Sequence, residues 1–329
     1  MSGCQPAAAP IPPASSLPAE SQPSWPTSNS GCFSQTLPPI PTSGEALVSS
    51  ACLFQIRCLA QAPLHPLGII AGNGVYPRLL ADSARKAGVQ KIVAAAFTGE
   101  TDPALMRHVD VIEWMRLGQL SRLLKFFRDQ TIHHAIMAGQ IAPKNLFDLR
   151  PDWKALLLLG KLKQRNAETI FAAIANQLAK VDVDLLPATT FLEDSLASSG
   201  LIAGPKLSRR EEEDVDFGWK IAKEISGLDI GQTVVVKDGT IVAVEAFEGT
   251  NDAIKRGGTL ARKGAVMVKV AKPNQDMRFD VPVIGVETIR IAVEAKLRVI
   301  AVEAGKTLLL EKDAIVELAS HSNISIVAR

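Results

Sequence analysis

From residue 67 onward, short apolar runs alternate with segments whose apolar positions recur at helical spacing. The first run, Leu67–Ala71, is followed by Gly72-Asn-Gly74 and then by a predicted helix from about Val75 to Ala87. Apolar runs bounded by turn residues predict buried strands, and a period near 3.6 predicts amphipathic helices. Further strands are expected at Lys91–Phe97, Val111–Trp114 and His134–Ala138, with a helix at Leu117–Asp129. Such alternation predicts a Rossmann-like parallel sheet covered by helices.

Two more helices, containing Leu156–Leu159 and Ile170–Leu178, and a strand at Ala188–Leu192 complete this predicted unit. The Ser- and Gly-rich stretch Ser198–Pro205 is typical of a linker. We therefore predict a Rossmann-like N-terminal domain at residues 67–200 and a C-terminal catalytic domain at residues 201–329.

The second half mixes strand and helix patterns. Glu211–Asp214 predicts the start of a helix, because acidic residues are favoured at a helix N-terminus. Asp238-Gly239 between two valine-rich runs predicts a type I′ hairpin. The other elements expected here are strands at Ala265–Val270, Arg298–Val302, Thr307–Leu310 and Ile324–Val327, and helices at Thr250–Leu260, after Val283 and at Lys312–Ser320. The predicted fold class is α/β, with a mixed C-terminal domain.

Residues 1–66 have a different composition from the rest. They hold most of the prolines, all four cysteines and only three charged side chains. Such a segment buries too little apolar surface to offset its ordering entropy, so we predict a disordered Pro/Ser-rich extension. It has no basic region before an unbroken apolar run, as a secretory signal would, and a mis-set start codon is an alternative origin.

Cysteine and charge exclude several function classes for residues 67–329. This part has no cysteine, which excludes a disulfide framework and a thiolate metal site and fits a cytoplasmic location. Its formal net charge is +3, with no basic stripe interleaved with aromatic residues, so we expect no nucleic-acid partner. It also lacks the apolar run of about 20 residues that a transmembrane helix needs.

Two glycine-containing turns follow predicted strands of the first half. Gly72, Asn73 and Gly74 resemble half of a dinucleotide fingerprint, but Pro77 replaces the third glycine and no acidic residue ends the second strand. A nucleotide or sugar-phosphate contact, NAD binding and a merely structural turn are the alternatives. Gly139 and Gln140 would lie at the same edge of the sheet, where an amide could bind a uracil or a sugar hydroxyl.

The sharper signal lies between Gly227 and Pro282, where carboxylates and amides follow apolar strands. The acidic set is Glu245, Glu248, Asp252, Asp276 and Asp280. Mg²⁺ prefers one or two carboxylates with water and phosphate oxygens, and it stabilises the charge that develops when a phosphoanhydride is cleaved. The Val-Pro after Asp280 fixes an extended backbone that would hold this carboxylate rigidly.

Lys272 lies in the same segment and suits a phosphate partner, although a surface ion pair is the alternative. The run Trp153-Lys-Ala-Leu-Leu-Leu-Leu-Gly is apolar enough to line an acyl-chain groove or to contact a membrane surface, the alternative being a buried helix.

Six motifs occur in order along residues 67–329: Leu67-Gly-Ile-Ile-Ala-Gly-Asn-Gly, Ala138-Gly-Gln, Leu228-Asp-Ile-Gly-Gln-Thr-Val-Val-Val, Val244-Glu-Ala-Phe-Glu-Gly-Thr-Asn-Asp, Val270-Ala-Lys-Pro-Asn-Gln-Asp and Phe279-Asp-Val-Pro-Val-Ile-Gly-Val. Together they resemble the LpxI family, the UDP-2,3-diacylglucosamine pyrophosphatases of lipid A biosynthesis in certain Gram-negative bacteria. The resemblance covers about residues 67–329.

The resemblance implies two domains with the lipid substrate between them and a Mg²⁺-dependent attack of water on the pyrophosphate. The products would be UMP and 2,3-diacylglucosamine 1-phosphate. The family's essential aspartate, in an Asp-x-Pro-x-Ile-Gly motif, matches Asp280, and its Glu-Gly-Thr-Asp aspartate matches either Asn251 or Asp252. A homodimer and a peripheral contact with the cytoplasmic face of the inner membrane are further expectations.

From motif and resemblance together we assign expected roles. Catalysis is expected of Asp280, Asp252 and Lys272, and Mg²⁺ binding of Asp280, Glu245 and Glu248. Contacts with UDP-2,3-diacylglucosamine are expected of Gly72, Asn73, Gly74, Gly139, Gln140, Gln232, Thr250 and Asn251. The alternative functions are a non-catalytic nucleotide-sugar or lipid-binding module and a nicotinamide-dependent oxidoreductase.

Overall fold

The first five strands form a parallel sheet. The computed structural model describes residues 65–141, 151–162 and 167–329, so the predicted extension lies almost wholly outside the described residues. The strands are β1 (Leu67–Ala71), β2 (Ile92–Phe97), β3 (Val111–Met115), β4 (His134–Ala138) and β5 (Asp184–Leu185). Their order in the sheet is β3-β2-β1-β4-β5, and all are parallel. All five carboxyl ends therefore meet at one edge, as predicted for a Rossmann-like sheet.

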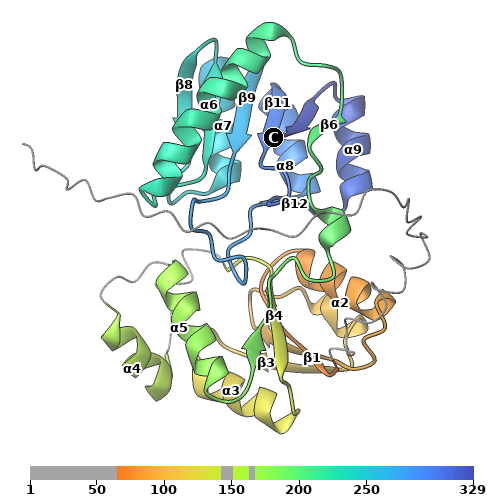
Figure 1. Ribbon diagram of the computed structural model, residues 1–329, viewed down its shortest axis with the longest axis vertical. Helices are drawn as coiled ribbons and strands as arrows, with labels where there is room; N and C mark the ends of the chain where they lie inside the picture. The colour runs from red at the N-terminus through yellow and green to blue at the C-terminus, as the bar shows by residue number, and fades with distance from the viewer. Residues whose placement is uncertain (1–64, 142–150, 163–166) are drawn as a thin grey trace, which may run out of the picture. The chain divides into compact units, whose positions relative to one another are not determined.

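Helices cover both faces of this sheet because neighbouring strand residues point to opposite sides. Ile69 packs with Leu80 of α2 (Tyr76–Lys86), and Ile70 belongs to the cluster around Phe127 of α3 (Leu120–Asp129). The second face also carries α4 (Trp153–Lys161) and α5 (Ala167–Ala179), as Figure 1 shows. A 3₁₀ helix, η1 (Pro103–Arg107), follows β2. β1 and β2 are buried along their whole length, which explains their unbroken apolar runs.

The remaining described chain forms a six-stranded mixed sheet. Its order is β6-β13-β11-β9-β7-β8, with β9, β11 and β13 parallel and β6, β7 and β8 pairing antiparallel. The strands are β6 (Gly200–Ala203), β7 (Thr233–Lys237), β8 (Thr240–Val244), β9 (Ala265–Lys269), β11 (Leu297–Val302) and β13 (Ser325–Ala328). A separate pair joins β10 (Val283–Ile284) to β12 (Leu308–Leu309).

Each face of the mixed sheet has its own core. The helix α6 (Arg209–Gly227) crosses one face, where it packs on valines of β7, β9 and β11 (Figure 1). The other face is covered by α7 (Thr250–Ala261), α8 (Val286–Glu294) and α9 (Lys312–His321). The predicted hairpin is confirmed, since Asp238 and Gly239 both have positive φ, at 52° and 75°.

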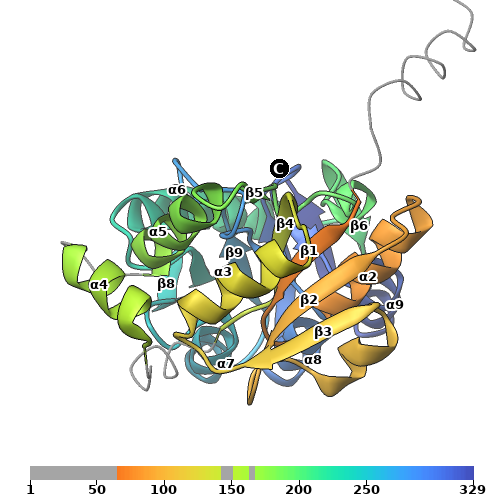
Figure 2. The same ribbon diagram turned by 90° about the horizontal axis from the view of Figure 1, so that it is seen from below.

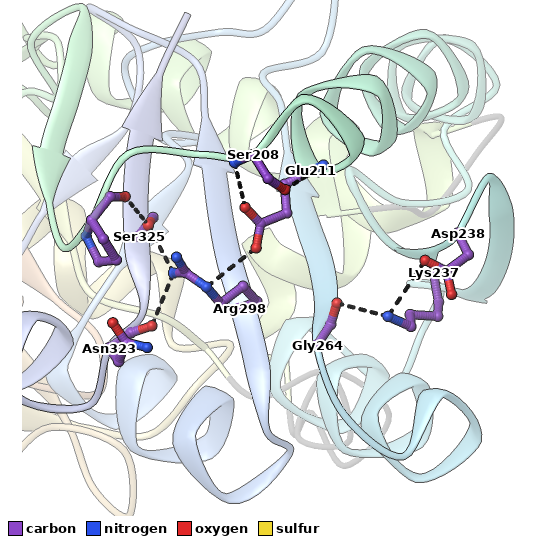
Figure 3. A network of polar contacts seen from close by, with 9 residues as sticks. Ser208, Glu211, Lys237, Asp238, Gly264, Arg298, Asn323 and Ser325 are labelled. Atoms are coloured by element: carbon purple, nitrogen blue, oxygen red, sulfur yellow. Dashed lines mark hydrogen bonds and ion pairs between the residues drawn. The ribbon is translucent and has the colours of Figure 1, made fainter.

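A polar network ties the start of α6 to the strands beneath it (Figure 3). Ser208 and Glu211 form a capping box at the helix N-terminus. Glu211 also lies 3.2 Å from Arg298 of β11, which donates 2.9 Å to the carbonyl oxygen of Asn323 and 3.0 Å to the hydroxyl of Ser325. One guanidinium therefore joins three segments that are far apart in the sequence.

Two predicted elements differ from the structure. Ser198–Pro205 is not a linker throughout, because Gly200–Ala203 forms β6 and pairs antiparallel with β13. The strand predicted at Ala188–Leu192 is a turn, in which the backbone N–H of Thr190 donates to the carbonyl oxygen of Pro187. Phe191 has a φ of 68°, which a strand does not allow. The division into two domains at residue 200 stays a prediction.

Candidate active site

Asp280 lies in the segment between β9 and β10, beside Lys272 and Asp229. The Lys272 Nζ atom forms an ion pair with Asp229 and lies 3.9 Å from Asp280 Oδ2. Burial raises the pKa of Asp280; the Lys272 ammonium, the Gln275 side chain and the Lys269 ammonium oppose this shift, and Asp229 adds to it. The structure therefore brings together two of the predicted catalytic residues, in a setting that makes the Asp280 charge costly.

The segment that carries Lys272 is anchored to the sheet by Glu303. The Glu303 carboxylate accepts hydrogen bonds from the backbone N–H of Ala271, at 2.8 Å, and from Lys223 Nζ, at 2.5 Å. Lys223 also donates to the carbonyl oxygen of Ala271, at 2.9 Å. Burial opposes ionisation of Glu303, but these donors and Lys306 hold its pKa below the usual range. Both the backbone N–H and the carbonyl oxygen of Ala271, the residue before Lys272, are therefore held by hydrogen bonds.

A second group of polar side chains is buried on the α7 face of the mixed sheet. We call it the Lys269 cluster: Thr233, Glu245, Thr250 and Lys269. Thr233 of β7 and Lys269 of β9 are register partners, and the backbone N–H of Glu245 donates to the Thr233 carbonyl oxygen at 2.8 Å. Thr250 opens α7 directly above them. Three neighbouring strand ends and a helix start therefore converge on one point.

Hydrogen bonds run through the Lys269 cluster in a chain. Lys269 Nζ donates to Thr250 Oγ1 at 3.0 Å, and Thr250 Oγ1 donates to Glu245 Oε1 at 2.7 Å. A second donation from Lys269 reaches the carbonyl oxygen of Val283, at 3.1 Å. Val283 follows Asp280 by three residues, so the buried ammonium links the Lys269 cluster to the segment that presents the Asp280 carboxylate.

The Lys269 cluster is charged and incompletely hydrogen-bonded. Burial lowers the pKa of Lys269, and the charges of Glu245 and Asp280 act in the opposite direction. Glu245 Oε2 and Thr233 Oγ1 are buried and have no hydrogen-bond partner among the described residues, and the same holds for the nearby Gln232 Oε1. Buried acceptors without donors are costly, so these oxygens are suited to a bound polar group.

Glycine at position 231 allows two backbone segments to approach each other closely beside the Lys269 cluster. A Cβ atom built on Gly231 would lie 2.0 Å from the carbonyl oxygen of Glu245, which no side chain tolerates without a backbone shift. The chain before β7 therefore passes directly against the chain after β8. This contact places Gln232, a predicted substrate-binding residue, beside the Lys269 cluster.

The other predicted carboxylates are paired with their own neighbours. Glu248 accepts a hydrogen bond from Arg256 at 2.5 Å, and Asp252 is exposed and lies 3.2 Å from Lys255. Asn251 Oδ1 accepts from the Thr288 hydroxyl at 3.3 Å. Asp276 forms an ion pair with Arg278. The structure thus brings Glu245 and Thr250 together, whereas Glu248, Asn251 and Asp252 make other contacts.

Magnesium ligands can be judged from the donor set that the structure describes. Within residues 65–141, 151–162 and 167–329 no three His, Cys, Asp or Glu side chains are grouped as a metal site. Mg²⁺ nevertheless needs only one or two protein carboxylates besides water and phosphate oxygens. Asp280 and Asp229 meet that need, because both lie at Lys272 and the negative charge of Asp229 disfavours ionisation of Asp280. Two carboxylates beside one lysine are as many protein ligands as a hydrated magnesium ion would need.

The two predicted glycine turns of the N-terminal sheet contact each other. Asn73 and Gln140 exchange two backbone hydrogen bonds, of 2.7 Å and 3.2 Å. A Cβ atom on Gly72 would lie 2.8 Å from the Gln140 carbonyl oxygen, and one on Gly139 would lie 2.6 Å from that of Asn73. Both glycines therefore have a structural reason, the close approach of two backbones at the carboxyl edge of the sheet.

A groove of about 860 Å³ opens at this edge. Its lining includes Asn73, Gly74, Glu100 and Trp114. Glu100 comes three residues after β2. An acidic side chain therefore lies near the end of the second strand, although none ends the strand itself. An amide, a carboxylate and an aromatic ring at the carboxyl ends of parallel strands can bind a base and a ribose.

The Asp280 segment reaches this part of the fold. Val281 and Val283 pack against the core cluster that contains Ala71, at the end of β1, and Tyr76, at the start of α2. The Tyr76 hydroxyl donates to the carbonyl oxygen of Ala188. The backbone N–H of Ala188 in turn donates to the carbonyl oxygen of Met277, at 2.7 Å. These contacts connect the chain before Asp280 with the first strand-to-helix turn.

Sequence reasoning missed two residues of the site, Lys269 and Asp229. A signal for Lys269 was present, because a single lysine interrupts the apolar strand Ala265–Val270. A charge inside a buried strand needs a partner, so this lysine marks a polar site. Asp229 gave no comparable signal, since an aspartate in a turn is ordinary.

Comparisons with known proteins agree across both halves of the described chain. Residues 66–195 match the profile of the LpxI N-terminal domain and residues 198–327 match that of the LpxI C-terminal domain. A curated relative from Caulobacter vibrioides, "UDP-2,3-diacylglucosamine pyrophosphatase LpxI", is 28% identical over an alignment of 277 residues that covers 80% of this chain and 97% of that protein.

Among solved structures, a biotin carboxylase domain dimer of the 2-oxoglutarate carboxylase of Hydrogenobacter thermophilus shows a weak likeness. It is 10% identical, with a TM-score of 0.24 over 59% of this chain and 41% of that chain. A likeness at this level carries no argument about function.

Proposed function

This chain belongs to the LpxI family, and we propose that it hydrolyses the pyrophosphate bond of UDP-2,3-diacylglucosamine in lipid A biosynthesis. The products are 2,3-diacylglucosamine 1-phosphate and UMP. The observation that carries the proposal is the setting of Asp280, a half-buried carboxylate with a raised pKa that lies beside Lys272 and Asp229. Hydrolysis of a phosphoanhydride needs such groups, which position water and compensate negative charge.

The residues at Asp280 divide this work. The Asp280 carboxylate accepts a hydrogen bond from the attacking water and orients it toward phosphorus. Lys272 offers its charge to a phosphate oxygen. A Mg²⁺ ion, held by Asp280 and Asp229, would neutralise charge on the pyrophosphate. The contact of Glu303 with Ala271 keeps Lys272 in place while the substrate enters.

Gln232 lies beside the Lys269 cluster and contributes a contact with the substrate in this proposal. The groove at Asn73, Gly74 and Trp114 offers a place for the uridine. Resemblance alone supports a homodimer, which sedimentation equilibrium would test, and a cytoplasmic location with peripheral membrane contact.

The test is release of UMP from UDP-2,3-diacylglucosamine by the purified full chain, with Mg²⁺ and with EDTA. We expect metal-dependent release and a loss of about a hundredfold or more in Asp280→Ala. Asp313→Ala is the matched control, because Asp313 is an exposed aspartate on α9. Tight substrate binding without turnover would favour a carrier, and absence of binding would refute the substrate.

Metal binding is tested separately from turnover. Titration calorimetry with Mg²⁺ alone should show binding to the wild-type chain that Asp229→Asn and Asp280→Asn each weaken. Unchanged heats in both variants would place the metal elsewhere, while leaving the assignment of the reaction untouched.

A further inference from the structure

The short helix α4 presents large apolar side chains to solvent. Trp153, Leu156 and Leu157 are 70%, 59% and 44% exposed. They are spaced i, i+3 and i+4, so they form one continuous stripe along the helix. Three large apolar residues that share one exposed helical face need an explanation, whereas single exposed ones do not.

The inner side of α4 is already occupied. Ala155 is buried in the core beside α3, and Leu158 packs against the same core. Asp152 caps the helix through a hydrogen bond of 2.9 Å from the backbone N–H of Ala155, and its other carboxylate oxygen accepts from Ser121, at 2.6 Å. The helix is therefore held in place with its stripe exposed. Figure 2 shows α4 at the outer margin of the helix layer.

Positive charge borders the stripe. Lys154 and Lys161 are both exposed, and α4 itself contains no acidic residue. The carboxylate of Asp152, which caps the helix, accepts hydrogen bonds from two backbone N–H groups. Apolar residues with a tryptophan and flanking lysines are the composition of a helix that lies in the surface of an anionic bilayer.

We propose that α4 docks on an anionic membrane surface, with Trp153, Leu156 and Leu157 inserted among the lipids and the two lysines at the headgroups. The helix does not span the membrane, since no described helix is long and apolar enough to cross one. The inference stands on the helix itself; the proposed function adds a reason, because a substrate with two acyl chains resides in a bilayer.

A second copy of the chain fits the stripe less well than a membrane does. In a two-fold interface the same patch meets itself, which would bring the lysines of both copies together. The helix has nine residues and is about 14 Å long, far too small for the roughly 800 Å² per partner of a stable interface. Charge and size both favour lipid.

The experiment measures binding of the full chain to vesicles by co-sedimentation. Vesicles of phosphatidylglycerol mixed with phosphatidylethanolamine are compared with vesicles of phosphatidylcholine. The test variant is Trp153→Ser/Leu156→Gln/Leu157→Gln. Trp153→Phe/Leu156→Met/Leu157→Met keeps the stripe apolar, and Leu260→Gln alters an exposed leucine of α7 instead. Circular dichroism confirms that each variant is folded.

We expect the wild type to bind the anionic vesicles and the polar triple variant to bind roughly tenfold more weakly or worse. The apolar triple variant and Leu260→Gln should bind like wild type. Lys154→Gln and Lys161→Gln should each weaken binding about fivefold at low salt, with a smaller effect at high salt.

Equal binding of the polar triple variant and wild type would overturn the proposal. Absence of wild-type binding to both kinds of vesicle would also overturn it. So would self-association of the wild type that the polar triple variant abolishes, because a second copy of the chain would then cover α4. Hydrolysis of substrate dispersed in detergent should be unchanged in the polar triple variant, so failure of membrane docking and failure of the proposed activity are separable.

Discussion

Removing both charges that meet at Thr250 should cost activity but not stability. Lys269 Nζ and Glu245 Oε1 lie 3.0 Å and 2.7 Å from the same hydroxyl oxygen, so at most about 5.7 Å separates them. At an effective dielectric constant of about 20, two unit charges at this distance attract each other by about 3 kcal/mol. We therefore expect a coupling free energy of about 3 kcal/mol between Lys269 and Glu245.

The net stability follows from the desolvation cost. Burial lowers the pKa of Lys269 despite the nearby carboxylates, so the cost of desolvating the ammonium exceeds the attraction. Lys269→Met/Glu245→Gln removes the charges and keeps the shapes, and we expect it to lie within about 1 kcal/mol of wild type or above it. The same variant should lose UMP release, because Val283 then loses its link to the ammonium.

The assay is a double-mutant cycle. Urea unfolding of wild type, Lys269→Met, Glu245→Gln and the double variant gives four free energies of unfolding, and their combination gives the coupling. A coupling below about 1 kcal/mol would mean that water screens the pair, which refutes the buried cluster. Full activity in the double variant would show that hydrolysis does not need these charges.

Three further predictions concern single residues. Asp280→Asn should become more stable than wild type as pH rises above about 4, because the raised pKa of Asp280 in the folded state makes its ionisation destabilise the wild type. Melting temperatures of both proteins at several pH values test this, and a difference that does not change with pH would contradict it. Gly231→Ala should cost about 2 kcal/mol or more in urea unfolding, since its Cβ would meet the Glu245 carbonyl oxygen, and Gly227→Ala, where a Cβ would meet nothing and φ is likewise not positive, is the control. Arg298→Met should lower the free energy of unfolding by about 3 kcal/mol, because it leaves Glu211 without its ion pair inside the network of Figure 3; a change below 0.5 kcal/mol, the scale of an ordinary surface substitution, would mean that water replaces the guanidinium.

Elements with strong local signals were predictable. The structure has strands at Leu67–Ala71 and His134–Ala138, as expected, because continuous apolar runs between turn residues suit strands buried on both faces. The Asp238-Gly239 hairpin was equally clear, since few residue pairs accept two positive φ values. Family membership was also readable from the order of the motifs.

Elements that depend on partners distant in the sequence were not predictable. Gly200–Ala203 is a strand only because β13, more than 120 residues later, supplies an edge for it to pair with. Its four residues carry two small side chains and an exposed leucine, so local composition indicates a linker. Ala188–Leu192 shows the reverse case, in which apolar residues form a turn because they pack in the core cluster around Tyr76.

The candidate site shows why an acidic set can be recognised in a sequence before its members can be assigned. Each of the five carboxylates singled out follows or lies between strands, and apart from Asp280, which Val-Pro follows, nothing local in the sequence separates them. The pairing of β7 with β9 in one register places Thr233 opposite Lys269, and a shift by one residue would turn that lysine to the α6 face. Register therefore decides that Glu245 is linked through Thr250 to the buried ammonium of Lys269. Glu248, three residues later, pairs with Arg256 on the surface. Because register is fixed by the cores of both faces together, the chemistry of this site is settled by packing far from any catalytic residue.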